Sequence, residues 1–221
     1  MVYNIPPSIF AYFECERCFW LERKGKMVKP SMPFPGVFGA LDSAQKKFTL
    51  NKDLQKLSPV LPQGRFVKLT TDYVSSAPIT IEGVDLRIRG KIDCLARHAD
   101  GTYGVYDLKT IRPNDDVLER YNPQLAAYAY ALAHPADGIC RYTPVSTVGL
   151  LCFYPGKACG RKQGYMSQRM EMTGFVGKPD YDLMFDILKV CARILKMDTP
   201  PPAGHECKTC ARVAACARNG W

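Results

Sequence analysis

Several kinds of segment are absent from the 221-residue sequence, and each absence excludes a class of protein. No run approaches the roughly 18–20 consecutive apolar residues that span a bilayer, so we expect no membrane-embedded segment. The first eight residues lack the basic and apolar segments of a secretory signal peptide, which makes the cytoplasm the expected compartment. There is no internal repeat, and no Gly-x-x-x-x-Gly-Lys-Ser/Thr motif that binds nucleotide phosphates, which excludes a helicase motor within the chain.

Acidic residues are scarce relative to basic ones. The chain has 21 Asp and Glu against 30 Lys and Arg, a formal net charge of +9. Such an excess suits a polyanionic partner such as DNA, and a generally basic surface explains it equally well. Hydrophobic residues make up 47% and charged residues 23%, as in ordinary globular proteins. We therefore expect a folded chain and, from its length, one large domain or two small ones.

Five of the ten cysteines are clustered at the two ends of a chain that shows no export signal, which favours metal binding over disulfides. Cys15 and Cys18 form one Cys-x-x-Cys pair, and Cys207 and Cys210 form another, followed by Cys216. A closed site needs four thiolates, so five cysteines compete for four positions. One solution combines Cys15 with Cys207, Cys210 and Cys216, and the other combines the two pairs. The remaining five are predicted to be small buried side chains: Cys94, Cys140, Cys152, Cys159 and Cys191.

Apolar periodicity and turn signals predict an α/β core with helical flanks. Helices are expected over 6–23 with Ser8 as N-cap, over 39–54, from Asn122-Pro123 to His134, and from Asp180 or Asp182 to before Pro200. Strands are expected over 84–95, 103–109, 148–154 and 164–172, with an Asp100-Gly101 turn joining the first two.

The segments Gly90-Lys-Ile-Asp93 and Asp107-Leu-Lys109-Thr110 carry the strongest chemical signal. Asp107 and Lys109 must share one face of their strand, and pairing with the preceding strand could bring Asp93 beside Asp107, in a register that the sequence leaves open. Two adjacent carboxylates suit Mg²⁺ or Mn²⁺, and a neighbouring lysine can orient water or offset phosphorane charge. These are the parts that phosphodiester hydrolysis requires. Taken alone, the same residues also fit an ordinary solvated strand face.

Gln124 and Tyr128 lie four residues apart on the helix that follows this strand, so both can face the carboxylates. There they would contact the phosphate backbone or orient Lys109. The alternative is a tyrosine packed in the core beside a glutamine at the start of the helix.

The combined order of these motifs resembles the RecB-type branch of the PD-(D/E)XK nucleases. The resemblance implies a restriction-endonuclease-like fold, a mixed β-sheet flanked by helices, in a single domain over 1–221 with its nuclease core at about 36–196. It implies that Asp93, Asp107 and the main-chain carbonyl of Leu108 bind the divalent metal. Lys109 is then the catalytic lysine, and Gln124 and Tyr128 support the site.

The family usually has a further His or Glu on an upstream helix, and the corresponding segment 36–42 contains no His. Asp42 is the candidate replacement, because a carboxylate is a competent Mg²⁺ ligand. An Asp near a helix N-terminus also serves the helix dipole, so both interpretations of Asp42 stay open.

The cysteine ends, at about 8–24 and 203–218, resemble those of the iron–sulfur nucleases of the AddB and CRISPR-adaptation exonuclease kind. The resemblance implies a 4Fe-4S cluster on Cys15, Cys207, Cys210 and Cys216, with Cys18 as the competing ligand and structural Zn²⁺ as the alternative. Either site would join the two ends of the chain and remove loop entropy from the unfolded state.

The resulting hypothesis is a metal-dependent deoxyribonuclease, an exonuclease acting on single-stranded DNA or DNA ends in repair, recombination or CRISPR adaptation. Any unwinding would need a helicase or nuclease-complex partner. Two rivals are a DNA-binding or assembly module with a degenerate nuclease site, and a structural subunit held together by the cysteine-bound metal.

Overall fold

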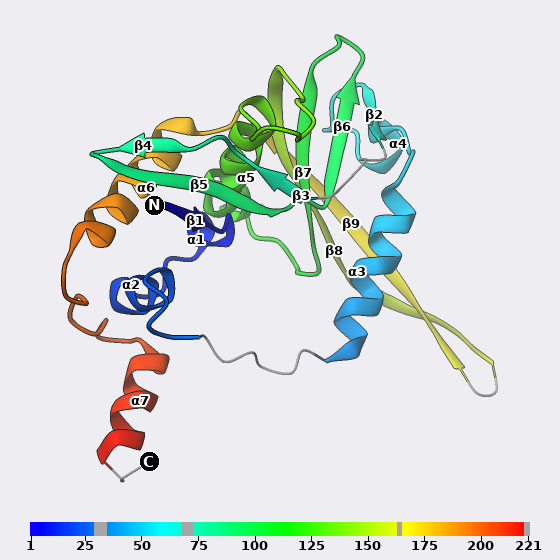
Figure 1. The fold of residues 1–221 in the computed structure, drawn as a ribbon. Coiled ribbons are helices and arrows are strands. Elements are labelled where there is room, and N and C mark those ends of the chain that lie inside the picture. Colours follow the sequence, from blue (N-terminus) through cyan, green and yellow to red (C-terminus); the bar gives the residue numbers. More distant parts are fainter. Residues whose placement is uncertain (29–34, 68–72, 163–164, 219–221) are drawn as a thin grey trace.

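The computed structural model describes residues 1–28, 35–67, 73–162 and 165–218. Two β-sheets meet at a long central helix, and further helices cover their outer faces (Figure 1). The mixed sheet flanked by helices agrees with the α/β architecture expected from the sequence.

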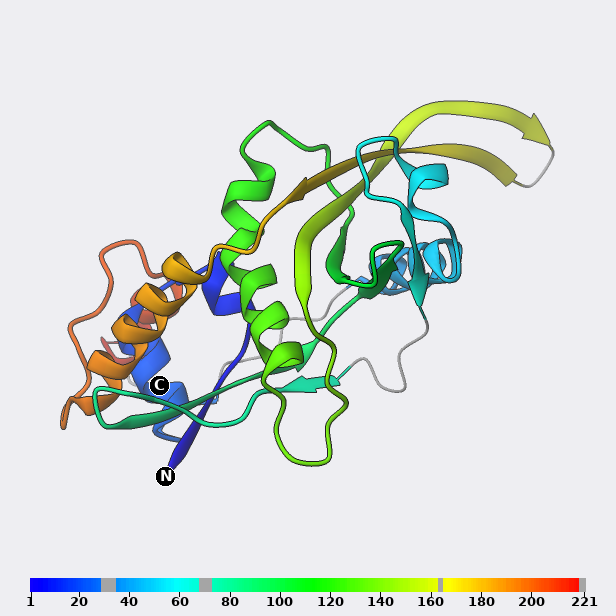
Figure 2. The same ribbon diagram turned by 90° about the horizontal axis from the view of Figure 1, so that it is seen from above.

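The larger sheet has the strand order β2-β6-β7-β8-β9. Its strands are β2 (Gly64–Val67), β6 (Cys94–His98), β7 (Tyr103–Lys109), β8 (Val145–Lys162) and β9 (Tyr165–Gly177). β7 and β8 pair in parallel, and the helix α5 (Val117–Ala133) lies between them in the sequence. The other pairs of this sheet are antiparallel. β8 and β9 run well past the predicted strands 148–154 and 164–172, and their far ends form an arm that extends from the body (Figure 2). Gly164 lies outside the described residues.

The smaller sheet is built around β5 (Val84–Lys91). Its partners are β1 (Val2–Ile5), β3 (Tyr73–Ser75) and β4 (Ile79–Ile81). The prediction of one strand over 84–95 is wrong, because the chain leaves this sheet at Lys91 and enters the larger one at Cys94. The two residues between the sheets, Ile92 and Asp93, form the bend, which frees the Asp93 side chain from strand alternation.

The N-terminal helix predicted over 6–23 is two helices, α1 (Ser8–Ala11) and α2 (Glu16–Arg23). Pro7, not Ser8, precedes α1, and extended backbone at Cys15 separates the helices. The helix predicted over 39–54 is likewise two, α3 (Gly36–Thr49) and α4 (Leu54–Leu57). Asn51, with a left-handed φ of 61°, stands between them and cannot continue a right-handed helix.

The central helix α5 begins at Val117, so the predicted start at Asn122-Pro123 is wrong and Pro123 lies inside the helix. Asn122 instead accepts a hydrogen bond from Asp180 N and donates one to Lys178 O, which joins α5 to the start of α6 (Tyr181–Lys196). α6 begins as predicted, because the Asp180 carboxylate accepts a hydrogen bond from Leu183 N.

Apolar side chains fill both faces of the larger sheet. One cluster packs β7 and β8 against α5 and α6, and a second packs the opposite face against the region around α4. β7 is therefore buried along most of its length, and its Asp107 lies on the face covered by α5. Three of the five cysteines predicted to be buried are buried, namely Cys94, Cys152 and Cys191. Cys140 is exposed, and the side chain of Cys159 lies outside the described residues.

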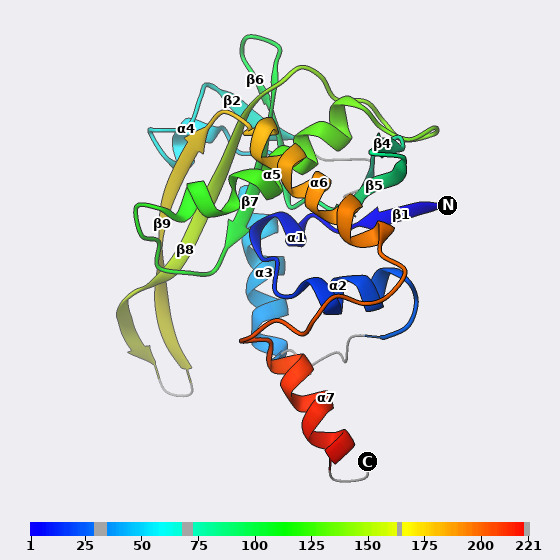
Figure 3. The same cartoon turned by 90° about the vertical axis from the view of Figure 1, so that its left-hand side faces the viewer.

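The C-terminal helix α7 (Lys208–Arg218) extends away from the body and begins next to α2, as Figure 3 shows. The segments near the two ends of the chain, α2 and the start of α7, therefore lie side by side. Among the described residues, no helix combines the length and the apolar character needed to cross a bilayer.

Candidate active site and cysteine group

The two carboxylates predicted to be neighbours are brought together where β6 begins and β7 ends. Cys94 pairs with Tyr106, which sets Asp93 beside the Asp107-Leu108 segment. Asp93 Oδ2 accepts a hydrogen bond of 3.0 Å from Leu108 N. The bend at Asp93 thus turns its carboxylate toward the neighbouring strand, next to Asp107.

Asp107 is 6% exposed, and its burial against α5 disfavours the charged carboxylate. Burial first, and then the negative charge of Asp93, raise the pKa of Asp107 to about 6, although the nearby Lys109 ammonium opposes this shift. Lys109 Nζ lies 2.7 Å from Asp107 Oδ2, on the same strand face as predicted. The three predicted residues Asp93, Asp107 and Lys109 therefore form one charged group at the sheet end.

Helix α3 adds a residue that the sequence reasoning did not assign to the site. Lys46 Nζ lies 2.9 Å from Asp93 Oδ1 and 3.2 Å from Asp42 Oδ2, so it joins the two carboxylates. Partial burial alone would lower the pKa of Lys46, but Asp93 and Asp42 raise it above its usual value. Asp42 thus lies at the edge of the group, separated from Asp93 by this ammonium. The spacing of four between Asp42 and Lys46 was the available signal.

Two further contacts fix α3 against the sheet. The buried Gln45 donates a 2.9 Å hydrogen bond to Thr110 Oγ1, the residue that follows Lys109. Thr49, fully buried, lies 3.6 Å from Cys94 Sγ. These bonds hold the helix that carries Asp42 and Lys46 close to the ends of β6 and β7.

Gln124 and Tyr128 are both 7% exposed and lie on α5. Burial first, and then the charges of Asp107 and Asp93, raise the pKa of the Tyr128 phenol, so it stays protonated and able to donate. Gly90 packs against the same tyrosine: a Cβ there would lie 3.5 Å from Tyr128 Cε1 and only 2.7 Å from Pro7 Cδ. The glycine of the Gly-x-x-Asp motif therefore permits close packing beside the carboxylates.

The carboxylate group fits a hard divalent cation. Asp107 Oδ2 is buried and receives no hydrogen bond from any described residue, its contact with Lys109 being an ion pair outside hydrogen-bonding geometry. Asp93 uses its two oxygens for Leu108 N and Lys46. Carboxylate and carbonyl oxygens, completed by water, are the ligands that Mg²⁺ and Mn²⁺ prefer.

The raised pKa of Asp107 predicts pH-dependent metal binding. If Asp107 binds the metal, its ionised carboxylate would be the ligand, and we expect Mn²⁺ affinity to rise about tenfold per pH unit below about 6 and to level off above it. Folding of the metal-free protein responds in the opposite sense: its free energy of unfolding should fall as pH rises from about 4 to above 6, because the buried acid must ionise. Titration calorimetry from pH 5 to 8 measures the affinity. A flat profile, or one unchanged in Asp107→Asn, would contradict the assignment.

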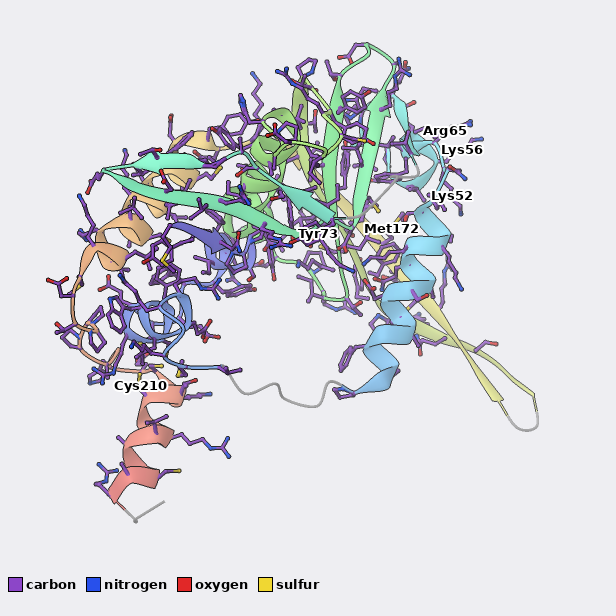
Figure 4. All side chains as sticks on the ribbon, in the orientation of Figure 1. Lys52, Lys56, Arg65, Tyr73, Met172 and Cys210 are labelled. Carbon is purple, nitrogen blue, oxygen red and sulfur yellow. The ribbon has the colours of Figure 1, made fainter. Side chains whose placement is uncertain are left out.

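Four cysteines from the two chain ends form a second group: Cys15, Cys18, Cys207 and Cys210. Their sulfur atoms all lie within 4.8 Å of one another, with Cys15–Cys210 at 3.8 Å and Cys18–Cys207 at 3.5 Å. Figure 4 shows Cys210 where α7 begins, below α2. Cys216 is exposed, farther along α7, and is not part of this group.

The electrostatics of the group suit a bound cation. Burial opposes ionisation of the Cys15 thiol, but hydrogen bonds from the backbone N–H groups of Cys18 and Gly204 lower its pKa to about 7. Burial and its bond to Cys207 raise the pKa of Cys18 above the usual value. Without a cation one thiol ionises at the expense of its neighbours, whereas a bound metal favours the thiolate form of all four.

Comparison with known proteins decides the family. A family model described as the PD-(D/E)XK nuclease superfamily matches residues 39–217. The chain belongs to the PD-(D/E)XK nuclease superfamily. The match includes Asp42, Lys46 and the groups of β6, β7 and α5, and it begins after Cys15 and Cys18. Members of this superfamily are generally nucleases that use Mg²⁺ or Mn²⁺, which agrees with the oxygen ligands at the sheet end.

One similar solved structure is a crystal structure of a protein designated SSO0001. The superposition covers 90% of this chain and 78% of the other, with a TM-score of 0.52 and 14% sequence identity. At this identity the likeness concerns the fold alone. No curated protein sequence matches the chain.

Proposed function

We propose that this PD-(D/E)XK protein is a deoxyribonuclease whose reaction is carried by Asp93, Asp107 and Lys109. The observation that carries the proposal is the buried Asp107 carboxylate, adjacent to Asp93 and in contact with the Lys109 ammonium. Two carboxylates and a lysine at one sheet end, within this superfamily, match the requirements of metal-assisted phosphodiester hydrolysis.

Each residue then has a distinct task. Asp93, Asp107 and the Leu108 carbonyl would hold Mg²⁺ or Mn²⁺, which polarises the phosphodiester and lowers the pKa of a bound water. Lys109 orients the attacking water and offsets negative charge on the phosphate. Gln124 and the protonated Tyr128, buried beside the carboxylates, support the site and its contact with the DNA backbone.

The net charge of +9 and the aromatic residue Tyr12, half-exposed and near Lys109, suit DNA that offers unstacked bases. We therefore propose single-stranded DNA or DNA ends as the substrate and exonucleolytic cleavage as the activity. The proposed biological role is DNA repair, recombination or CRISPR adaptation, together with a helicase or nuclease-complex partner. The described ion pair of Lys46 with Asp42 and Asp93 favours one rival, a DNA-binding module in which lysine has replaced the metal.

The test is cleavage of DNA labelled at either end, single- or double-stranded, with Mg²⁺, Mn²⁺ or EDTA. We expect metal-dependent cleavage in which label is released first from one end, because an exonuclease starts at a terminus. Circular single-stranded DNA of the same sequence is the matched control and should stay intact. Cleavage of the circular DNA would show that the activity is endonucleolytic and not exonucleolytic. Salt-sensitive binding without any cleavage would favour the binding module.

Asp42→Ala tests the third carboxylate. If Asp42 completes the metal site, the variant should need about tenfold or more Mn²⁺ for half-maximal cleavage, as in other losses of a supporting ligand, with little change in DNA binding. Asp186→Ala, on the exposed ion pair with Lys189, is the matched control. An unchanged Mn²⁺ requirement in Asp42→Ala would exclude Asp42 as a metal ligand and leave it only the ion pair with Lys46.

For the cysteine group we propose a structural site that joins the ends of a single nuclease domain. A tetrahedral ion with thiolates at about 2.3 Å holds its sulfur atoms roughly 3.8 Å apart. The observed spacing of 3.5–3.8 Å among the bonded pairs suits such a single ion and favours Zn²⁺ on Cys15, Cys18, Cys207 and Cys210. A 4Fe-4S cluster, in which each thiolate binds a different iron, needs wider spacing and is the alternative.

A further inference from the structure

Lys109 is held from two sides. One contact is the ion pair with Asp107, and the other is the ring of Tyr121, whose centroid lies 4.5 Å from Lys109 Nζ. An ammonium over an aromatic face is attracted by the ring quadrupole, more strongly where water is excluded. Tyr121 is 7% exposed and lies on α5 three residues before Gln124 and seven before Tyr128, on the same helix face. The ring therefore limits where the ammonium can lie.

The Tyr121 ring is itself held by a residue from another part of the chain. Its hydroxyl forms a 2.5 Å hydrogen bond with the hydroxyl of Tyr12, and the two rings meet edge to face at 5.7 Å. The bond with Tyr121 lowers the pKa of Tyr12, with smaller contributions from Arg120 and Lys109, whereas burial and the same bond raise the pKa of Tyr121. Either hydroxyl can be the donor in this bond.

Tyr12 lies in the link between α1 and α2, three residues before Cys15. The backbone at Tyr12 and Cys15 is outside helical geometry, and the link is joined to the two helices by the bonds from Tyr12 N to Ser8 O and from Phe19 N to Cys15 O. Cys15 is also fixed by its sulfur, which contacts Cys210 Sγ at 3.8 Å and accepts a hydrogen bond from Gly204 N. Tyr12 and Cys15 also line the same cavity of about 380 Å³, which leaves the link room to shift when the sulfur contacts are lost.

We infer that Tyr12 and Tyr121 are positioning residues that make the placement of Lys109 depend on the four-cysteine group. The inference rests on the proposed function only in naming Lys109 as the catalytic lysine. A filled cysteine site fixes Cys15, which fixes the link and Tyr12. Tyr12 then orients Tyr121, and the Tyr121 ring holds the ammonium beside Asp107. The metal-bound cysteine group that joins the chain ends thereby contributes to catalysis as well as to folding.

The first test reads the position of Lys109 without any cleavage. In protein labelled with ¹³C-lysine, the ε-CH₂ signal of Lys109, assigned with Lys109→Arg, should be shifted upfield by the Tyr121 ring current. Tyr12→Phe removes one hydroxyl and keeps the ring, and it should move this signal toward that of an exposed lysine. Tyr142→Phe, whose ring contacts Tyr103 at the opposite end of β7 from Lys109, is the matched control and should leave the signal in place.

Removal of the metal from the cysteine group should move the Lys109 signal in the same direction. After removal, Tyr12→Phe should have little further effect, because the route from the cysteines to Tyr121 is already broken. A Lys109 signal that stays in place in Tyr12→Phe, or that ignores loss of the metal in the folded protein, overturns the inference. Circular dichroism checks that each sample is folded.

Kinetics provide the second readout. Tyr12→Phe should lower kcat about fivefold to tenfold while leaving KM for DNA nearly unchanged, since the lost interaction orients a group that acts in the transition state. A rise in KM alone would instead make the Tyr12 hydroxyl a DNA-binding contact and overturn the positioning role. If the wild type cuts no DNA but the Lys109 signal responds as expected, the proposed function fails and the coupling stands.

Discussion

Lys109→Ala should lower the rate of DNA cleavage about 10²–10³-fold, the usual effect of removing a group that stabilises transition-state charge. The structure supplies the reason: Lys109 Nζ is in contact with Asp107 Oδ2 and is held over the Tyr121 ring, so it lies at the predicted metal site in a restricted position. The variant should still bind DNA, because one charge among 30 basic residues is lost. Single-turnover cleavage and a binding assay at the same salt concentration separate the two effects.

The matched control is Lys189→Ala, which removes an exposed lysine that pairs with Asp186 on α6. It carries the same change in net charge and should cut like the wild type. Equal activity in Lys109→Ala and Lys189→Ala would contradict the catalytic role. A second consequence is specific to Lys109: its ammonium opposes the rise in the Asp107 pKa, so Lys109→Ala should shift Mn²⁺ binding to higher pH.

Cys207→Ser should produce the largest loss of stability. Cys18 and Cys207 are 189 residues apart in the chain, and closing a loop of that length stabilises a fold by about 5 kcal/mol in the chain-entropy model of cross-links. Loss of one thiolate weakens the bound metal and with it this closure, so Tm should fall by about 10 °C or more. Thermal unfolding followed by circular dichroism measures the change, and elemental analysis of the same samples reports zinc or iron. A brown preparation absorbing at about 400 nm would favour the iron–sulfur cluster.

Two serine variants make this result specific. Cys140 is exposed and outside the group, so Cys140→Ser should leave both Tm and metal content unchanged. Cys216→Ser distinguishes the two ligand sets. It should leave Tm and metal content unchanged if Cys18 is the fourth ligand, and it should lower both as Cys207→Ser does if Cys216 is the fourth ligand. A loss of metal in Cys216→Ser together with full retention in Cys18→Ser would exclude the set that the geometry favours.

Local patterns were enough to predict part of this protein. Strand alternation put Asp107 and Lys109 on one face, and the four-residue spacing put Gln124 and Tyr128 on one side of a helix. The Asp100-Gly101 turn predicted the antiparallel pairing of β6 and β7, which brings Asp93 close to Asp107. Each of these relations depends on backbone geometry over a few residues, and the order of the motifs along the chain was enough to indicate the superfamily.

The helix boundaries show where local patterns fail. Pro123 is a good first residue of a helix, yet α5 begins six residues earlier and includes it. Tertiary packing of the buried α5 face overrides the local preference, since Val117 and Tyr121 belong to the same core as Leu125. Likewise the chain bends at Asp93 because β5 and β6 belong to different sheets, which strand propensity alone does not reveal.

The sequence by itself determined the chemistry that this protein carries: two carboxylates, a lysine, and cysteines at both ends in numbers and spacings that suit metals. Only the tertiary structure decided which of these groups meet. It joined Lys46 to Asp42 and Asp93, paired Tyr12 with Tyr121 over a separation of 109 residues, and gathered Cys18 rather than Cys216 with the other thiols. The physical reason is that periodicity fixes which way a side chain points within one element, whereas contacts between distant elements depend on how the whole core packs.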